Sequence, residues 1–307
     1  MNGPNPGTKS LRPAPALPEW LAPMMPFSRG VIEIGSKPMH LVCHGEGRPV
    51  LLLHGNPTWS FLWRKVIERL DPAKFLCVAP DLFGLGLSHK PGRIEDHSLA
   101  FHADAVAALM EVLDLRDVIL VGQDWGGPIG GAAAARAAGR VTALVMGNTA
   151  LLRPKTPIRT TAFHRFARVP VLSDLVFRGL NFPVPILHRV QGDRSSIRGS
   201  VARAYTYPLR RFRDRIAPLA LARMVPSRED HPTMPELGRV EEWVRAFRGP
   251  AALVWGTRDP ILGRALKRLR EALPRASVEE TGAGHFLQEE VPDRLAQAIR
   301  AVSAARA

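Results

Sequence analysis

The sequence predicts an α/β fold, built on a mostly parallel, doubly wound sheet with helices on both faces. Short apolar runs alternate with longer stretches of helical periodicity from Val31 onward, which is the pattern of consecutive β-α units. Val50–Leu53 is apolar at every position, as expected of a strand that is buried on both faces. The chain has 307 residues, 46% of them hydrophobic, and is therefore long enough to bury a large core without disulfides or a metal.

The predicted elements follow one another in a regular order. The first is a hairpin, because the apolar runs Val31–Ile34 and Met39–Cys43 flank the turn Gly35-Ser36. After Val50–Leu53, apolar residues at helical spacing predict helices, and compact apolar runs predict the strands between them. The predicted helices are Ser60–Leu70, Phe101–Leu113, Arg264–Leu273 and Asp293–Ala305, and the predicted strands are Phe75–Ala79, Val118–Val121, Val141–Met146, Ala251–Trp255 and Ser277–Glu280.

The alternation stops between residues 151 and 248. This stretch has many prolines, no apolar run typical of a strand and several amphipathic helical patterns, such as Ser200–Arg213. Because strands resume after it, we predict a helical cap domain (residues 151–248) inserted into one core domain made of residues 27–150 and 249–307. Residues 1–26 are rich in Pro and Gly, and we expect them to form a flexible N-terminal arm.

The charge of the chain is strongly basic. It has 42 Lys and Arg against 28 Asp and Glu, a net charge of +14, and residues 151–248 account for 19 basic and 8 acidic residues, a net charge of +11. The arginines are scattered, with no run of basic residues longer than Arg210-Arg211, and no nucleic-acid-binding signature accompanies them. We therefore expect no nucleic-acid partner.

Other features of the sequence indicate where the protein is located and whether it needs a metal. No apolar stretch is long enough to span a bilayer and the N-terminal residues do not resemble a signal peptide, so we expect a cytoplasmic protein with no membrane insertion. Cys43 and Cys77, the two cysteines of the chain, fall in apolar runs and are predicted to be inert core thiols. No Cys/His cluster has the spacing of zinc ligands, so no metal is expected.

Three polar side chains follow predicted strands. Asp124 is the central residue of Gly122-Gln123-Asp124-Trp125-Gly126, the strand–turn pattern of a nucleophile elbow with Asp where Ser is usual. Asp259 follows the strand Ala251–Trp255, and His285 follows the last short strand. The chain order of nucleophile, acid and histidine, each after a strand, predicts that Asp124, Asp259 and His285 form a catalytic triad.

An aspartate nucleophile restricts the chemistry. A carboxylate is ionised at neutral pH and displaces a leaving group at a saturated carbon without a base, which leaves an ester on the protein. His285 is then needed only to activate the water that hydrolyses this ester, and Asp259 to orient the imidazole. This excludes ordinary esterase or protease chemistry and indicates halides or epoxides as substrates.

The loop after Val50–Leu53 favours halides. Backbone N–H groups of this loop, His54–Trp59, and of Trp125 are expected to form the oxyanion hole. The side chains of Asn56 and Trp125 add two neutral N–H donors that suit a departing halide ion. An epoxide needs an acid instead, usually a tyrosine. The chain has two, Tyr205 and Tyr207, so epoxide hydrolysis through the same Asp124 stays open as the alternative.

Several motifs resemble those of the haloalkane dehalogenase family. They are HGNPTWSFLWR (54–64), DLFGLGLSHKP (81–91), VGQDWGGPIG (121–130), GNT (147–149) and GAGHFLQEEVPD (282–293). The resemblance covers most of residues 31–300 and implies an α/β-hydrolase fold with an inserted helical cap. It implies that a small halogenated hydrocarbon and water are converted to an alcohol, a halide ion and a proton, with no cofactor or metal.

The resemblance also assigns the site residues. It implies Asp124 as nucleophile, His285 as base, and Asn56 with Trp125 as the halide-binding pair. Family members carry the acid either as Glu after the strand that corresponds to Val141–Met146 or as Asp after the next core strand. The first position here is Asn148, without a carboxylate, so the role falls to Asp259. Asn148 itself is expected to cap a helix or line the pocket.

Related families remain as alternatives. Fluoroacetate dehalogenases place an arginine after the nucleophile, where this chain has Trp125. Luciferase-type oxygenases are similar to dehalogenases and the same triad does not exclude them. A protein without catalysis that binds an anionic partner through its basic cap is the alternative from a different class. The sequence leaves the oligomeric state open.

Overall fold

The computed structural model describes residues 11–158 and 160–305. Within them lies one sheet whose strands are β1 (Arg12–Pro13), β2 (Arg29–Ile34), β3 (Lys37–His44), β4 (Arg48–Leu53), β5 (Phe75–Pro80), β6 (Val118–Asp124), β7 (Val141–Thr149), β8 (Ala251–Gly256) and β9 (Ser277–Thr281). The α-helices of the core are α1 (Arg64–Ile67), α2 (Leu99–Val112), α3 (Gly126–Arg136), α9 (Leu266–Ala272), α10 (Leu287–Glu290) and α11 (Pro292–Ala304). Short 3-10 helices span η2 (Ala22–Met24), η3 (Ser60–Trp63), η4 (Ile94–Asp96) and η9 (Gly263–Ala265).

The sheet is antiparallel at one edge and parallel elsewhere. Its strand order is β1-β2-β3-β5-β4-β6-β7-β8-β9, with β4 to β9 all parallel to one another. The chain moves outward from β4 to β5 and then returns to place β6 on the other side of β4. The carboxyl ends of β4 and β6 therefore lie at the point where the winding reverses, which is where open α/β sheets bind ligands.

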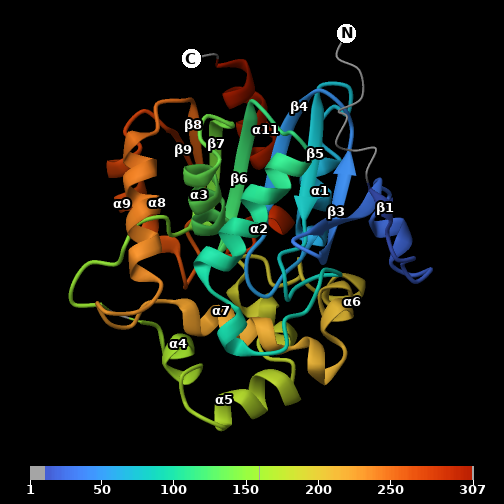
Figure 1. The fold of residues 1–307 in the computed structure, drawn as a ribbon, viewed down its shortest axis with the longest axis vertical. Helices are drawn as coiled ribbons and strands as arrows, with labels where there is room; N and C mark the ends of the chain where they lie inside the picture. The colour runs from blue at the N-terminus through green and yellow to red at the C-terminus, as the bar shows by residue number, and fades with distance from the viewer. Residues whose placement is uncertain (1–10, 159, 306–307) are drawn as a thin grey trace.

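Alternate side chains of the central strands pack into two different cores. Leu51 and Leu53 of β4 belong to the layer formed with α2, α3 and α9, whereas Val50 and Leu52 belong to the layer formed with α1 and α11. Successive residues of a strand point to opposite faces, so a strand covered on both sides must be apolar at every position. The two layers are visible in front of and behind the sheet (Figure 1). The predicted doubly wound sheet is confirmed.

Residues 150–250 join β7 to β8 through helices. They are α4 (Ala162–Phe166), α5 (Leu172–Asp174), the π-helical turn η5 (Leu175–Gly179), η6 (Val184–Val190), α6 (Gly199–Thr206), η7 (Tyr207–Leu209), η8 (Phe212–Asp214), α7 (Ile216–Met224) and α8 (Met234–Ala246). Helices α4 to α7 gather beyond one end of the sheet, with α5 outermost (Figure 1). They have a small core of their own, in which Phe177 and Leu219 are fully buried.

Three sequence expectations differ from the structure. Part of the expected flexible arm is packed, because Leu21 and Met25 are buried in the apolar layer that also contains α1 and α11. Residues 1–10 of the expected arm lie outside the described residues. The helix expected over Ser60–Leu70 begins as a 3-10 turn and its α-helical part ends at Ile67. The helix expected over Ser200–Arg213 ends at Thr206, since Pro208 cannot donate a backbone hydrogen bond to continue it.

Within the described part of the chain, no helix is both long enough and apolar enough to cross a bilayer.

Candidate active site

Asp124 lies on a sharp turn between β6 and α3. Its backbone is left-handed, with φ of 50°, a conformation that costs energy for a residue with a side chain and that lifts the carboxylate above the sheet. The turn depends on glycine, because a Cβ at Gly126 would lie 2.0 Å from the carbonyl oxygen of Leu53 on the neighbouring strand. The expected nucleophile elbow thus has a local steric cause.

Backbone groups of the β4 loop enclose the carboxylate of Asp124. A Cβ at Gly55 would lie 2.4 Å from the Cβ of Asp124, so only glycine allows this approach. The N–H of Asn56 donates to Oδ1 at 2.7 Å, and the N–H of Trp125 donates to the same carboxylate. Burial raises the pKa of Asp124, while His285 and these N–H donors oppose that shift. Negative charge that develops on Oδ1 would meet donors already in place.

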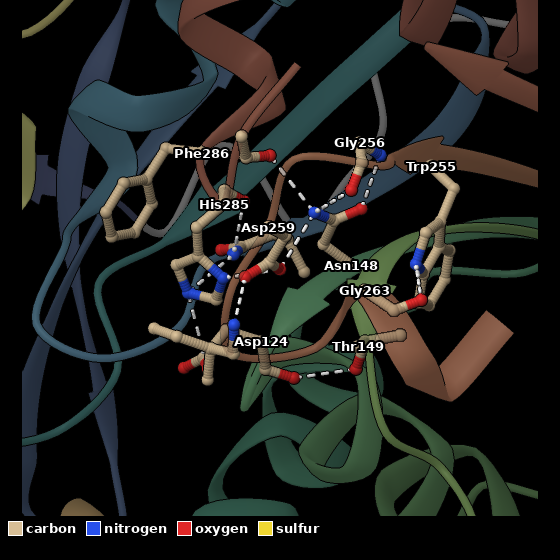
Figure 2. Close-up of polar contacts among 12 residues, drawn as sticks. Asp124, Asn148, Thr149, Trp255, Gly256, Asp259, Gly263, His285 and Phe286 are labelled. Atoms are coloured by element: carbon tan, nitrogen blue, oxygen red, sulfur yellow. Dashed lines mark hydrogen bonds and ion pairs between the residues drawn. The ribbon is translucent and has the colours of Figure 1, made fainter. Parts of the chain in front are cut away.

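His285 and Asp259 face Asp124 from the loops after β9 and β8 (Figure 2). The Nδ1 atom of His285 lies 2.9 Å from Oδ2 of Asp259, and its Nε2 atom lies 3.7 Å from Oδ2 of Asp124. The carboxylate at Nδ1 favours the tautomer whose Nε2 lone pair is free to take a proton. Burial alone would lower the pKa of His285, but Asp259 and Asp124 together raise it above the ordinary value. His285 is thus arranged as a base, held by one carboxylate and directed at the other.

Asn148 holds Asp259 in place. Its Nδ2 donates to Oδ2 of Asp259 at 2.8 Å, the same oxygen that His285 contacts, and its Oδ1 accepts the N–H of Gly256 at 2.7 Å (Figure 2). The N–H of Ile261 donates to Oδ1 of Asp259 at 2.7 Å. Burial would raise the pKa of Asp259, but His285 and backbone donors lower it below the ordinary value. The sequence expectation for Asn148, a helix cap or pocket wall, missed this contact.

Gln123 is a second residue that the sequence analysis did not single out. It is fully buried, its Nε2 lies 3.3 Å from Nε2 of His285, and the same nitrogen donates to the carbonyl oxygen of His285 at 3.1 Å. The bond to the backbone of His285 fixes Gln123 beside the ring nitrogen that faces Asp124. The signal available in the sequence was its position beside Asp124, at the end of the strand.

The expected halide pair lies at the same end of the sheet. The side-chain Nδ2 of Asn56 donates to the carbonyl oxygen of Pro218 on α7 at 2.9 Å. An amide nitrogen carries two protons, so one remains for a ligand. Trp125 follows Asp124 directly and its side chain is 8% exposed. Pro218 could not be found from sequence, because it contributes only a backbone carbonyl.

The two tyrosines occupy different surroundings. Tyr205 on α6 is buried and donates its hydroxyl to Oε1 of Glu289 at 2.6 Å, while Arg64 holds the two oxygens of Glu289 at 2.6 and 2.8 Å. Burial and Glu289 raise the pKa of Tyr205 well above the ordinary value. Tyr207 packs edge-on against Trp20 and beneath the guanidinium of Arg210. The hydroxyl of Tyr205 is therefore committed to a core carboxylate.

Residues 11–158 and 160–305 bring together no group of three or more His, Cys, Asp or Glu side chains that could hold a metal ion.

Most of the named relatives are haloalkane dehalogenases, and one relative carries the name of a different activity. A family described as "alpha/beta hydrolase fold" matches residues 48–185. A protein named haloalkane dehalogenase, from Mycolicibacterium paratuberculosis, is 36% identical over 269 residues, which cover 85% of this chain and 86% of that relative. A cis-3-alkyl-4-alkyloxetan-2-one decarboxylase from Shewanella oneidensis is 29% identical over 283 residues, 90% and 88% of the two chains. Among solved structures, the haloalkane dehalogenase DatA from Agrobacterium tumefaciens C58 superposes with a TM-score of 0.80 at 28% identity, covering 92% of this chain and 99% of that one.

Proposed function

Because this chain belongs to the haloalkane dehalogenase family, we propose that it hydrolyses the carbon–halogen bond of haloalkanes to an alcohol, a halide ion and a proton. The observation that carries this proposal is the buried carboxylate of Asp124, raised on a left-handed turn and faced by the pair His285 and Asp259. A carboxylate in that position is a nucleophile for a saturated carbon, and no general base is needed for its attack.

The first step is a displacement at carbon. An oxygen of Asp124 forms a bond to the halogen-bearing carbon as the carbon–halogen bond breaks, and the electron pair leaves with the halide. Asn56 Nδ2 and the indole N–H of Trp125 bind the departing ion. Halide departs without a proton, so neutral N–H donors suffice where an alkoxide would need an acid. The product of this step is an alkyl ester on Asp124.

The second step hydrolyses that ester. His285 takes one proton from a water molecule, and the resulting hydroxide attacks the carboxyl carbon of Asp124. The N–H groups of Asn56 and Trp125, which already donate to this carboxylate, stabilise the negative charge on its carbonyl oxygen. The alcohol leaves with one of the two protons of the water, the other proton passes to solvent, and Asp124 is regenerated. Asp259 holds the imidazole and stabilises its charged form.

The proposal also includes the division of the chain into domains and the location of the protein in the cell. We assign residues 151–248 as the inserted cap domain, in which α4 to α7 lie over the site and α8 packs beside the core helices, 27–150 and 249–307 as the core, and a cytoplasmic location. The contact between Asn56 and the carbonyl of Pro218 supports a cap that closes directly on the halide-binding loop. The surroundings of Tyr205 do not favour the epoxide alternative, because its hydroxyl already donates to Glu289.

The test of the proposed function is product release from a panel of substrates. Purified protein is incubated with bromo- and chloroalkanes, a terminal epoxide and a cis-3-alkyl-4-alkyloxetan-2-one, and halide, diol and alkene are measured. We expect halide and alcohol in equal amounts from the haloalkanes. Diol from the epoxide without halide from any haloalkane, or alkene from the oxetanone alone, would contradict the proposal. The oxetanone belongs in the panel because one relative bears the name of its decarboxylase.

Halide binding gives a separate prediction. If the indole N–H of Trp125 holds the ion, bromide or iodide quenches tryptophan fluorescence with saturation. The chain has six tryptophans, so the quench is partial and Trp125→Phe should abolish the saturable part. Asn56→Ala is expected to weaken halide binding and to slow the displacement step roughly 10²–10³-fold, as for loss of one preorganised donor. A saturable quench that survives unchanged in Trp125→Phe would remove Trp125 from the halide site.

A further inference from the structure

We propose that the outer tip of the cap binds the surface of an anionic lipid bilayer. The "cap tip" comprises six side chains: Val169, Val171, Leu172, Leu175, Leu180 and Phe212. They are 40% to 71% exposed, and the one other large apolar side chain of comparable exposure in the described residues is Val112 on α2. Surface apolar residues are normally scattered, so a cluster of this kind indicates a contact surface.

The residues of the cap tip come from neighbouring segments of the cap. Five of its members lie within twelve consecutive residues around α5 and η5, which form the outermost end of the molecule (Figure 1). Phe212 joins them through Arg178, whose guanidinium carbon lies 4.3 Å from the centre of the Phe212 ring. The small core behind this surface, built around Phe177, is closed by its own residues. The outer leucines and valines are therefore not needed to complete it.

The positive charge around the cap tip favours an anionic bilayer as its partner. Residues 160–215 contain eleven arginines and three aspartates, a net charge of +8. Arg165, Arg210 and Arg211 are exposed and form no ion pair within the described residues. Exposed apolar side chains in a strongly basic segment match an anionic bilayer, where the apolar groups enter the headgroup region and the guanidinium groups contact phosphates. A second copy of the chain fits poorly, because it would bring two such positive surfaces together.

Vesicle binding by the whole chain tests this proposal. Sucrose-loaded vesicles of phosphatidylcholine, alone or mixed equally with phosphatidylglycerol, are sedimented with the protein at low salt and at about 0.5 M salt, where surface charges are screened. We expect binding to the mixed vesicles at low salt, little binding to phosphatidylcholine, and loss of binding at high salt. No sedimentation with the mixed vesicles at low salt would overturn the proposal.

Matched variants separate the apolar contribution to vesicle binding from the electrostatic contribution. Leu172→Ser with Leu175→Ser is expected to weaken vesicle binding at least tenfold, whereas Val112→Ser leaves it unchanged. Arg210→Gln with Arg211→Gln is expected to weaken vesicle binding by about fivefold for each charge removed. The control is the same change at Arg264 and Lys267, which are exposed on the surface of the core domain, and it should have little effect. Equal loss in the tip and control variants would overturn the proposal.

Other occupants give distinguishable results. Light scattering that shows a wild-type dimer, converted to monomer by the leucine changes, would assign the tip to a second copy instead. Binding of polyglutamate that is as tight as vesicle binding and insensitive to the leucine changes would indicate an acidic protein partner. The measurement uses no haloalkane, so vesicle binding by a protein without dehalogenase activity would reject the proposed function and leave the cap tip as assigned.

Discussion

Replacement of His285 by Phe is expected to reduce steady-state halide release about 10⁴-fold or more while leaving one halide released per active site. The asymmetry follows from the nucleophile. The carboxylate of Asp124 attacks carbon without a base, so the first step survives, whereas no group remains to activate water for the second. The alkyl ester should accumulate. Rapid-quench measurement of halide shows the burst, and mass spectrometry of the intact protein after exposure to a bromoalkane shows a gain of one alkyl group.

The location of the adduct and a second variant complete this experiment. The added mass is expected on the peptide that contains Asp124, and Asp124→Asn should show neither burst nor adduct. The burst of His285→Phe should itself fall as the pH drops through the pKa of Asp124, because only the ionised carboxylate attacks. Burial has raised that pKa, and loss of His285 removes an opposing influence. Repeated turnover by His285→Phe would exclude the covalent mechanism.

Replacement of Asp259 by Asn is expected to slow ester hydrolysis about 10⁴-fold, with alkylation of Asp124 changed much less. The amide cannot stabilise the imidazolium, and it no longer favours the tautomer with a free Nε2. In the wild type, hydrolysis requires neutral His285 and declines as the pH falls through a pKa that Asp259 has raised. The variant should therefore lose rate at every pH and show its acidic decline at lower pH. Single-turnover measurements of halide and alcohol separate the two steps.

Asn148→Ala provides the comparison for this result. It removes the donor to Oδ2 of Asp259 and leaves the N–H of Gly256 without its acceptor, so the free energy of unfolding should fall by about 2 kcal/mol. Hydrolysis should slow only about tenfold, since Ile261 still holds the other oxygen and the carboxylate remains. A larger loss in Asn148→Ala than in Asp259→Asn would show that the acid has been placed at the wrong strand.

The core of the fold was predictable because the local sequence pattern identifies each strand. Val50–Leu53 is apolar at every position, and the structure buries its alternate residues in two different layers. The predictions that were wrong concern segments whose conformation depends on contacts with residues far away in the sequence. The composition of residues 11–26 resembles a linker, yet Leu21 and Met25 are buried in the same apolar layer as α1 and α11, which only the folded chain assembles. The early end of the helix at Thr206 was readable in principle, from Pro208.

The residues of the site also fall into those that the sequence predicts and those that it does not. Asp124, Asp259 and His285 each follow a strand and stand in motifs, so their chemistry could be predicted from residue type and chain order. Asn148 and Gln123 act through neutral amides on partners 111 and 162 residues away, and neither carries a charge or spacing that indicates its role. The hydrogen bond from Asn56 to Pro218 uses a backbone carbonyl, which every residue possesses.

The buried contact of Tyr205 with Glu289 has a consequence for how the cap can diversify. Removal of one partner from a buried ion pair such as Arg64 and Glu289 costs about 3–5 kcal/mol, a large part of the stability of a domain. Substitutions of Tyr205 that disturb this buried pair are therefore expected to cost stability before they alter function. Exposed positions of α4 and α5 carry no such penalty. We expect lineages of this enzyme to acquire new specificities and new surface partners through α4 and α5, with Tyr205 of α6 inherited almost unchanged.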